Sequence, residues 1–347
     1  MNLEKVMNKR SPNGDVGIEV EVEFKDGRVP TNIPTVRNWY AKEDGSLRAG
    51  REFVTRLPVK ADGSLKTKRL GPLFDAIGSL IVDDSPRTSC HVHVNALRLT
   101  PIEVCNAMVL YWLVENVLYD VCGDERKRNG YSARLIDNPN YINQIIELVK
   151  TCKMFTSSTY RGEISRYSSM NLAALNEHGS IEYRGMYGNY NTDSLANWVF
   201  TLNHIQNVMS KKFSDPLQIM DKYISSSNVP KFLQNIIGPF ITDLDFSDKK
   251  LDLCEQNAIT IAGFCYMHEP VSSWERWQTQ LFERIKKRDD EQLVSTSTDQ
   301  SPTTTPTPST VSNLGVECLL TPGMDEYDRW VTRQLEILHN RSIQRTR

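Results

Sequence analysis

The sequence lacks several motifs that would assign a function directly. It contains no G-x-x-x-x-G-K-[ST] loop and no G-x-G-x-x-G run, so the two common glycine-rich phosphate-binding loops are absent. It also has no G-x-S-x-G motif, which would indicate a serine nucleophile on a sharp turn. Any binding of a nucleotide must therefore rely on cations rather than on a glycine-rich loop.

The chain also lacks an excess of positive charge and a regular cysteine pattern. Lys and Arg number 41 against 43 Asp and Glu, for a net charge of −2, so the composition does not predict nucleic-acid binding. The seven cysteines are an odd number and form no C-x-x-C pair. This usage fits a reducing compartment, and we expect a cytoplasmic protein.

Long hydrophobic runs are missing as well. The longest, "VCNAMVLYWLVENVLYDV", is interrupted by Asn106, Glu115 and Asn116, so it falls short of the roughly 20 apolar residues of a membrane span. The N-terminal residues include no apolar h-region, and we expect neither a secretory signal nor a membrane partner. With 347 residues the chain can form one large domain with additions, or two domains.

The elements that are present predict an α+β fold. Short alternating runs predict strands at 16–24, 50–56 and 88–95, and a further strand-rich stretch at 163–190 has "NEHG" as a hairpin turn. Helices are expected at 101–121, 141–152 and 194–212; the first has a T-x-x-E capping box from Thr100 to Glu103. The expected organisation is a core at 1–212, a helical addition at 213–293, a Ser/Thr/Pro-rich linker at 294–316 and a tail helix at 317–347.

The segment "GIEVEVE" at 17–23 places three carboxylates on one face of a strand. Side chains alternate along a strand, so Glu19, Glu21 and Glu23 lie opposite the apolar residues between them. Like charges in this arrangement repel. Either water on an exposed sheet surface or a bound cation can absorb that repulsion.

Three other predicted strands also carry acidic or imidazole side chains on the face opposite their apolar residues. In "CHVHVN" at 90–95, His91 and His93 share a face, and two imidazoles at this spacing can hold a metal from one side. Glu52 in "GREFVT", and Glu182 with Arg184 in "SIEYRG", also lie opposite apolar residues. Taken singly, each is typical of an exposed strand or an ion pair. If the strands share one sheet, they form an acidic trough that suits Mg²⁺ or Mn²⁺.

In order, these motifs resemble those of the amidoligases of bacteria and phages, which are related to glutamine synthetase and the glutamate–cysteine ligases. The matching stretches are "GIEVEVE", "KEDGSLRAGREFVT", "CHVHVN", "SRYSSMNL" and "SIEYRGMYG", and they cover roughly residues 15–210. The resemblance implies a glutamine-synthetase-like core, a curved antiparallel sheet with packed helices, whose concave face binds ATP through Mg²⁺ ions. The region beyond 210 has no counterpart in the resemblance.

The resemblance also implies roles for individual residues. Metal ligands would be Glu19, Glu21, Glu52, Glu182 and one of His91 and His93. Arg184 is similar to the arginine that steadies the transferred phosphate, and it forms the catalytic pair with Glu182. Arg166, Tyr167 and Asn171 would line the substrate or nucleotide end of the site. Glu23 has no role in the resemblance.

The function that follows is an ATP-dependent carboxylate–amine ligase. ATP would phosphorylate the carboxylate of a small molecule or peptide, and an amine would then displace phosphate to form an amide bond. Alternatives that the residues leave open are a metal-dependent hydrolase, of which a cupin-like oxidase is a variant, and a ligase-like module for binding or assembly without catalysis. A homo-oligomer is compatible with the sequence.

Overall fold

The structure is a computed structural model that describes residues 1–82, 85–123, 126, 132–137, 167–266 and 269–297. The chain forms two compact units, Met1–Ala262 and Gly263–Arg347. The expected helix at 141–152 and tail helix at 317–347 lie outside the described residues, as does the expected linker beyond Ser297.

The described residues form strands, α-helices and shorter helical turns. The strands are β1 (Val16–Glu23), β2 (Trp39–Lys42), β3 (Gly50–Thr55), β4 (Ser89–Asn95), β5 (Met170–Asn171) and β6 (Ser180–Tyr187). The α-helices are α1 (Leu3–Val6), α2 (Gly71–Ile77), α3 (Pro101–Leu118), α6 (Ala174–His178), α7 (Thr192–His204), α8 (Pro216–Ile224), α9 (Val229–Ile237), α10 (Asp248–Cys265) and α11 (Val271–Ser297). The shorter π or 3-10 turns are η1 (Lys66–Leu70), η3 (Leu135–Asp137), η4 (Ile205–Met209) and η5 (Ser210–Lys212).

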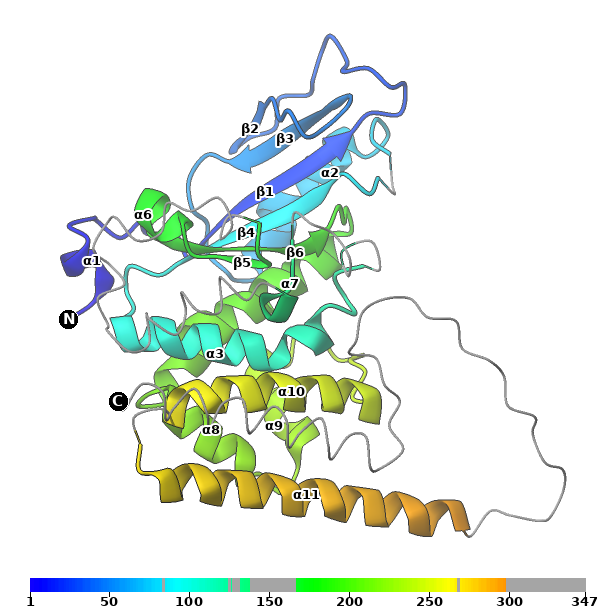
Figure 1. The fold of residues 1–347 in the computed structure, drawn as a ribbon. Helices are drawn as coiled ribbons and strands as arrows, with labels where there is room; N and C mark the ends of the chain where they lie inside the picture. The colour runs from blue at the N-terminus through cyan, green and yellow to red at the C-terminus, as the bar shows by residue number, and fades with distance from the viewer. Residues whose placement is uncertain (83–84, 124–125, 127–131, 138–166, 267–268, 298–347) are drawn as a thin grey trace, which may run out of the picture. The chain divides into compact units, whose positions relative to one another are not determined.

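The six strands form one sheet in the order β2-β3-β1-β4-β6-β5, and every neighbouring pair is antiparallel (Figure 1). The α+β class and the antiparallel sheet expected from the sequence are confirmed. The three strands predicted in the first hundred residues end within one residue of their expected bounds. β6 joins the sheet from far along the chain and lies beside β4, which brings distant motifs together.

The core lies against one face of the sheet. Val20, Phe53 and Cys90 are buried on that face, and Figure 1 shows α2 and α7 behind the strands. Gln206, in the η4 turn that continues α7, donates from its amide to the carbonyl oxygens of Val94 and Asn95, both at 3.1 Å. Because side chains alternate, covering this face with helices leaves the opposite face for the acidic residues.

The helix predicted at 101–121 is confirmed as α3, with the expected start. The Thr100 hydroxyl accepts from the Glu103 backbone N–H, and the Glu103 carboxylate accepts from the Thr100 N–H. The helix ends at Leu118, three residues before the expected end. Its side chains are buried from Val104 to Leu118, which explains why the sequence shows apolar residues all around it.

The connection within the strand-rich stretch differs from the expected hairpin turn. β5 pairs with β6, but the chain between them forms α6, which ends at Gly179 in the left-handed conformation, φ 69°. A short helix was missed because "NEHG" has the polar composition of a turn. The helix expected at 194–212 is confirmed as α7, which continues through the η4 and η5 turns.

The second unit contains the long helix α11, which begins within the helical addition expected at 213–293. Near its start the Trp274 and Trp277 rings stack with centroids 5.5 Å apart, and the Tyr266 ring lies 5.8 Å from that of Trp274. Among the described residues, no helix is both long and apolar enough to cross a membrane. No disulfide links the five cysteines within the described ranges.

One carboxyl in the core is out of reach of water. Glu115 of α3 is fully buried, where it accepts hydrogen bonds from the Ser169 hydroxyl and from the Leu135 backbone N–H at 2.9 Å. Burial, which outweighs these hydrogen bonds, raises the pKa of Glu115 to about 8. The folded protein therefore holds a proton here that the unfolded chain, with the usual pKa of 4.5, gives up.

Glu115→Gln should remove a pH-dependent loss of stability. The pKa of Glu115 is higher in the folded state than in the unfolded state, so protonation of Glu115 stabilises the native form. This stabilisation is complete below pH 4.5 and is lost as the pH rises to about 8. Within that window the wild type should lose up to about 1.4 kcal/mol per pH unit relative to the variant. Urea unfolding from pH 5 to 8 measures this, with exposed Glu177→Gln as control; parallel curves for wild type and Glu115→Gln would contradict the prediction.

Gly179→Ala should destabilise the fold, because an alanine there meets two obstacles. The left-handed backbone costs roughly 1–2 kcal/mol for a residue with a side chain. A Cβ would also lie 2.6 Å from Leu97 Cγ. Urea denaturation should show a loss of at least about 1 kcal/mol. The matched control is Gly63→Ala, where a Cβ meets nothing within 4 Å and which should change stability by under about 0.5 kcal/mol.

Candidate metal centre

Cross-strand pairing aligns the predicted site residues, together with Lys42, on one face of the sheet. The register places them opposite one another on five pairs of neighbouring strands. These pairs are Lys42 with Glu52, Glu52 with Glu21, Glu19 with His91, His93 with Glu182, and Glu182 with Asn171. Residues directly opposite have Cβ atoms roughly 4.5–5.5 Å apart, so their side chains must interact. The four motifs seen separately in the sequence thus form one continuous row.

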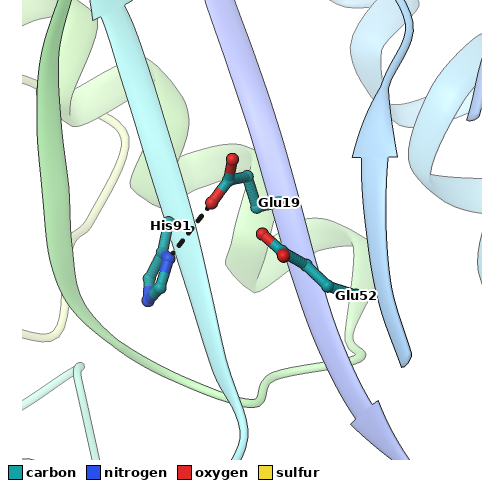
Figure 2. Close-up of side chains that lie close together, drawn as sticks. All are labelled: Glu19, Glu52 and His91. Carbon is teal, nitrogen blue, oxygen red and sulfur yellow. Dashed lines mark hydrogen bonds and ion pairs between the residues drawn. The ribbon is translucent and has the colours of Figure 1, made fainter. Parts of the chain in front are cut away.

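The first cluster that could hold a cation joins three strands. Glu19 of β1, Glu52 of β3 and His91 of β4 point toward one another (Figure 2). Each offers one ligand atom, and these atoms lie within 4.8 Å of one another. His91 Nδ1 is 3.3 Å from Glu19 Oε2. Two carboxylates and an imidazole are a donor set that suits Mg²⁺ or Mn²⁺.

A second cluster shares Glu19 with the first. It consists of Glu19, His93 and Glu182, again with ligand atoms within 4.8 Å of one another. His93 Nε2 lies 3.6 Å from Glu19 Oε1, and His91 Nδ1 lies 3.5 Å from Glu182 Oε1. The two oxygens of Glu19 thus face different histidines. A carboxylate in this position can bridge two adjacent cations.

Both clusters open into one cavity of about 740 Å³. Six carboxylates line it: Glu19, Glu21, Asp44, Glu52, Glu177 and Glu182. The cationic side chains in its wall are Lys42, Arg87, Arg126 and Arg184. The cavity therefore combines sites for cations with groups that attract anions. We call it the acidic cavity.

Two cationic side chains are tied directly to the carboxylates. Lys42 Nζ lies 2.9 Å from Glu52 Oε2 and 3.9 Å from Glu19 Oε1. Arg184 pairs with Glu182 through its guanidinium, while the Asn171 amide donates to the other oxygen of Glu182 at 2.6 Å. The carboxylates at both ends of the row are thus fixed in place by hydrogen bonds.

The carboxyls of Glu19 and Glu52 ionise unequally. Burial and the neighbouring Glu19 raise the pKa of Glu52 to about 8, although the Lys42 ammonium opposes this shift. Burial also favours a higher pKa for Glu19, but hydrogen bonds from His91 and Glu52 and the charges of both histidines outweigh it. The pKa of Glu19 is therefore held well below its usual range. Two crowded carboxyls with one strongly acidic member are typical of functional sites.

A bulge interrupts β6 beside Arg184, which lines the cavity. Cys90 pairs with Met186, and Val92 pairs with Tyr183. Two residues of β4 are therefore matched by three residues of β6. The extra residue lies at Arg184 and Gly185, whose carbonyl oxygens accept from the buried Arg126 guanidinium at 2.7 and 3.3 Å. Bulges of this kind re-aim side chains next to functional sites.

The structure brings together nearly all the site residues predicted from the sequence. Both histidines and the four predicted metal-binding glutamates line the acidic cavity, together with Tyr167, Asn171 and Arg184. Arg166 lies outside the described residues. Glu23 lies outside the cavity lining, and its carboxylate accepts from the Arg48 backbone N–H at 2.9 Å and the Ser85 hydroxyl at 2.6 Å. The roles of these residues stay predictions.

Several lining residues were missed from the sequence. Lys42 has no local signal, because its place depends on the pairing of β2 with β3. Arg87 and Arg126 lie outside the predicted strands. Ser89 did have a signal, since it precedes His91 by two residues and so lies on the same face of β4.

No model of a known protein family matches the chain, and no curated protein matches it. Inferences about function therefore depend on the acidic cavity and on the order of the motifs.

Glu19→Gln should abolish binding of a divalent cation, because Glu19 belongs to both clusters. The Mn²⁺ dissociation constant should rise more than the roughly 10–100-fold that loss of an outer-shell partner costs. Titration of free Mn²⁺ by electron paramagnetic resonance measures this. Glu23→Gln removes a charge from the same strand outside the cavity and should leave the affinity unchanged. Equal affinity in wild type and Glu19→Gln would place the cation elsewhere.

Proposed function

We propose that this protein is an ATP-dependent carboxylate–amine ligase with a glutamine-synthetase-like core. The observation that carries the proposal is the convergence of Glu19, Glu52, Glu182 and two histidines, from four strands, in one cavity that also contains arginines. The order of the sequence motifs supports the same class. The residues fit Mg²⁺ or Mn²⁺, because oxygen ligands predominate and the described residues that line the cavity include no cysteine.

The charge of the cavity argues that nucleotide and cation bind together. A triphosphate is strongly anionic, and six carboxylates line the wall against four cationic side chains. At close range in a partly buried site such repulsion is large. A divalent cation held by Glu19, Glu52 and His91 would offset this negative charge and would supply an electrophile for the phosphate oxygens. ATP affinity should thus depend on the cation far more than in a site with a P-loop lysine.

Two cationic side chains of the cavity can bind the anionic oxygens of nucleotide or substrate. Arg184 lines the cavity and is held by Glu182, so its guanidinium can stabilise charge on the transferring phosphoryl group. Lys42, at the other end of the row, can bind a phosphate or substrate carboxylate oxygen. Tyr167 and Asn171 line the same cavity and, with Arg166, are proposed to contact substrate or nucleotide.

The reaction needs no covalent nucleophile from the protein. The γ-phosphoryl group is transferred to a carboxylate oxygen of the substrate, which gives an acyl phosphate and ADP. An amine then attacks the acyl carbon, a proton leaves the amine, and phosphate departs as the amide forms. Cys90 is not suited to take part, because it is buried on the core face and burial raises the pKa of its thiol to about 12.

A non-hydrolysable ATP analogue should stabilise the protein only together with Mg²⁺. At 100 times the dissociation constant, a ligand specific for the native state adds about 2.7 kcal/mol. For a unit of this size that raises the melting temperature by roughly 5–10 °C. A thermal-shift titration with and without Mg²⁺ measures this, and Glu19→Gln should abolish the shift while Glu23→Gln keeps it.

Two results of that titration would contradict the proposal. Stabilisation by Mn²⁺ or Zn²⁺ with no further effect of nucleotide would favour the metal-dependent hydrolase. An equal shift by the ATP analogue without Mg²⁺, retained in Glu19→Gln, would place the nucleotide away from the acidic cavity.

A further inference from the structure

A buried serine connects one predicted metal ligand to another. The Ser89 Oγ lies 2.5 Å from Glu21 Oε2 and 2.7 Å from His91 Nε2. All three residues are almost inaccessible, with exposed fractions of 3%, 5% and 3% for Ser89, Glu21 and His91. Both contacts are within hydrogen-bond distance, so the directions of the two bonds depend on each other.

Counting hydrogens links the direction of one bond to that of the other. A serine hydroxyl has one hydrogen, and an ionised carboxylate can only accept. When Ser89 donates to the Glu21 carboxylate, its oxygen is free to accept from His91. The hydrogen of that second bond belongs to His91 Nε2. His91 Nδ1 lies within hydrogen-bond distance of Glu19 Oε2, at 3.3 Å, and 3.5 Å from Glu182 Oε1, so without a cation it can also bear a hydrogen. A divalent cation bound at Nδ1 would take the place of that hydrogen, and the proton of His91 would then lie on Nε2.

We propose that Ser89, held by Glu21, is a positioning residue that keeps the proton of His91 on Nε2 and so directs Nδ1 to a divalent cation. The inference rests on the proposed function only in taking that cation to bind at the acidic cavity. Metal-binding histidines generally donate their other ring N–H to a fixed acceptor, which sets the tautomer and orients the ring. Here the acceptor is a hydroxyl whose own hydrogen is held by a carboxylate.

This assignment gives Glu21 a different role from the one predicted. The sequence resemblance made it a metal ligand beside Glu19, but neither cluster of possible ligands contains it. Its Oε2 accepts from Ser89, and its Oε1 lies 3.8 Å from His91 Nε2, on the side of the ring away from Glu19. Glu21 therefore acts on the cation through Ser89 and His91 rather than by direct contact.

The second histidine has the opposite arrangement. His93 Nδ1 lies 3.1 Å from the Ser180 hydroxyl, and its Nε2 faces Glu19 Oε1 at 3.6 Å. The two imidazoles thus present different ring nitrogens to the two oxygens of one carboxylate. Ser180 is buried, like Ser89, but it contacts only the other histidine of the pair. It provides a matched control.

The first measurement is a nuclear magnetic resonance experiment on protein with ¹⁵N-labelled histidine and saturating Mg²⁺. Long-range ¹H–¹⁵N correlations show which ring nitrogen bears the proton. In the wild type, His91 should have its proton on Nε2. In Ser89→Ala this preference should be lost, whereas Ser180→Ala should alter only the signals of His93. Protonated Nδ1 with unprotonated Nε2 in wild-type His91 would overturn the inference.

The second measurement is Mn²⁺ affinity in the same variants. Ser89→Ala should weaken binding roughly 10–100-fold, the usual cost of losing an outer-shell partner, and Ser89→Thr should restore it by returning the hydroxyl. Glu21→Gln keeps an acceptor for Ser89 and should weaken binding less than Glu19→Gln. Circular dichroism verifies the fold of each variant.

The outcomes separate this inference from the proposed function. If wild-type protein binds Mn²⁺ and Ser89→Ala binds it equally well, the positioning role is wrong and the metal centre stands. If Glu21→Gln loses binding as completely as Glu19→Gln, Glu21 is a direct ligand and the positioning role is wrong. If the wild type binds no Mn²⁺, the metal centre and this inference both fall.

Discussion

The structure depends on holding like charges together on one face of a sheet. Glu21 and Glu52 lie directly opposite each other on neighbouring strands, and Glu19 lies two residues from Glu21 on the same face of β1. Like charges in such pairs destabilise a sheet. Lys42 and His91 offset part of the repulsion within the protein. A divalent cation would offset far more, because two carboxylates and an imidazole offer ligand atoms within 4.8 Å of one another.

The rest of the fold holds this face rigid. The opposite face is buried beneath helices, and Gln206 ties the η4 turn to the end of β4. Arg126 fixes the carbonyl oxygens at the bulge of β6. Sites built on strands vary less in geometry than sites on loops. The acidic residues can therefore stay close even though they repel, because the core and not the site determines the positions of the strands.

The sequence was sufficient to predict which side chains share a face of each strand, but not which residues lie beside them on the neighbouring strands. Alternation with a period of two predicted that Glu19, His91, His93 and Glu182 lie opposite apolar residues, and that is observed. Lys42 could not be placed, because its position depends on a pairing that leaves no local pattern. The β6 bulge was missed for a related reason, because it appears only in the pairing of β6 with β4. The helix α6 was missed because "NEHG" has the polar composition of a turn. Ser89 lay within reach of the alternation argument, yet its importance appears only with the position of Glu21.

The alternation of β4 has a further consequence for folding. A slip of one residue in its pairing would turn every side chain to the other face. His91 and His93 would then enter the core, and Cys90 and Val92 would take their places among the carboxylates. The same slip in β1 would bury three glutamates in an apolar interior, at a large desolvation cost. The acidic residues thus help to specify strand register, because burying the same charges that can bind a cation would make a mispaired sheet unstable.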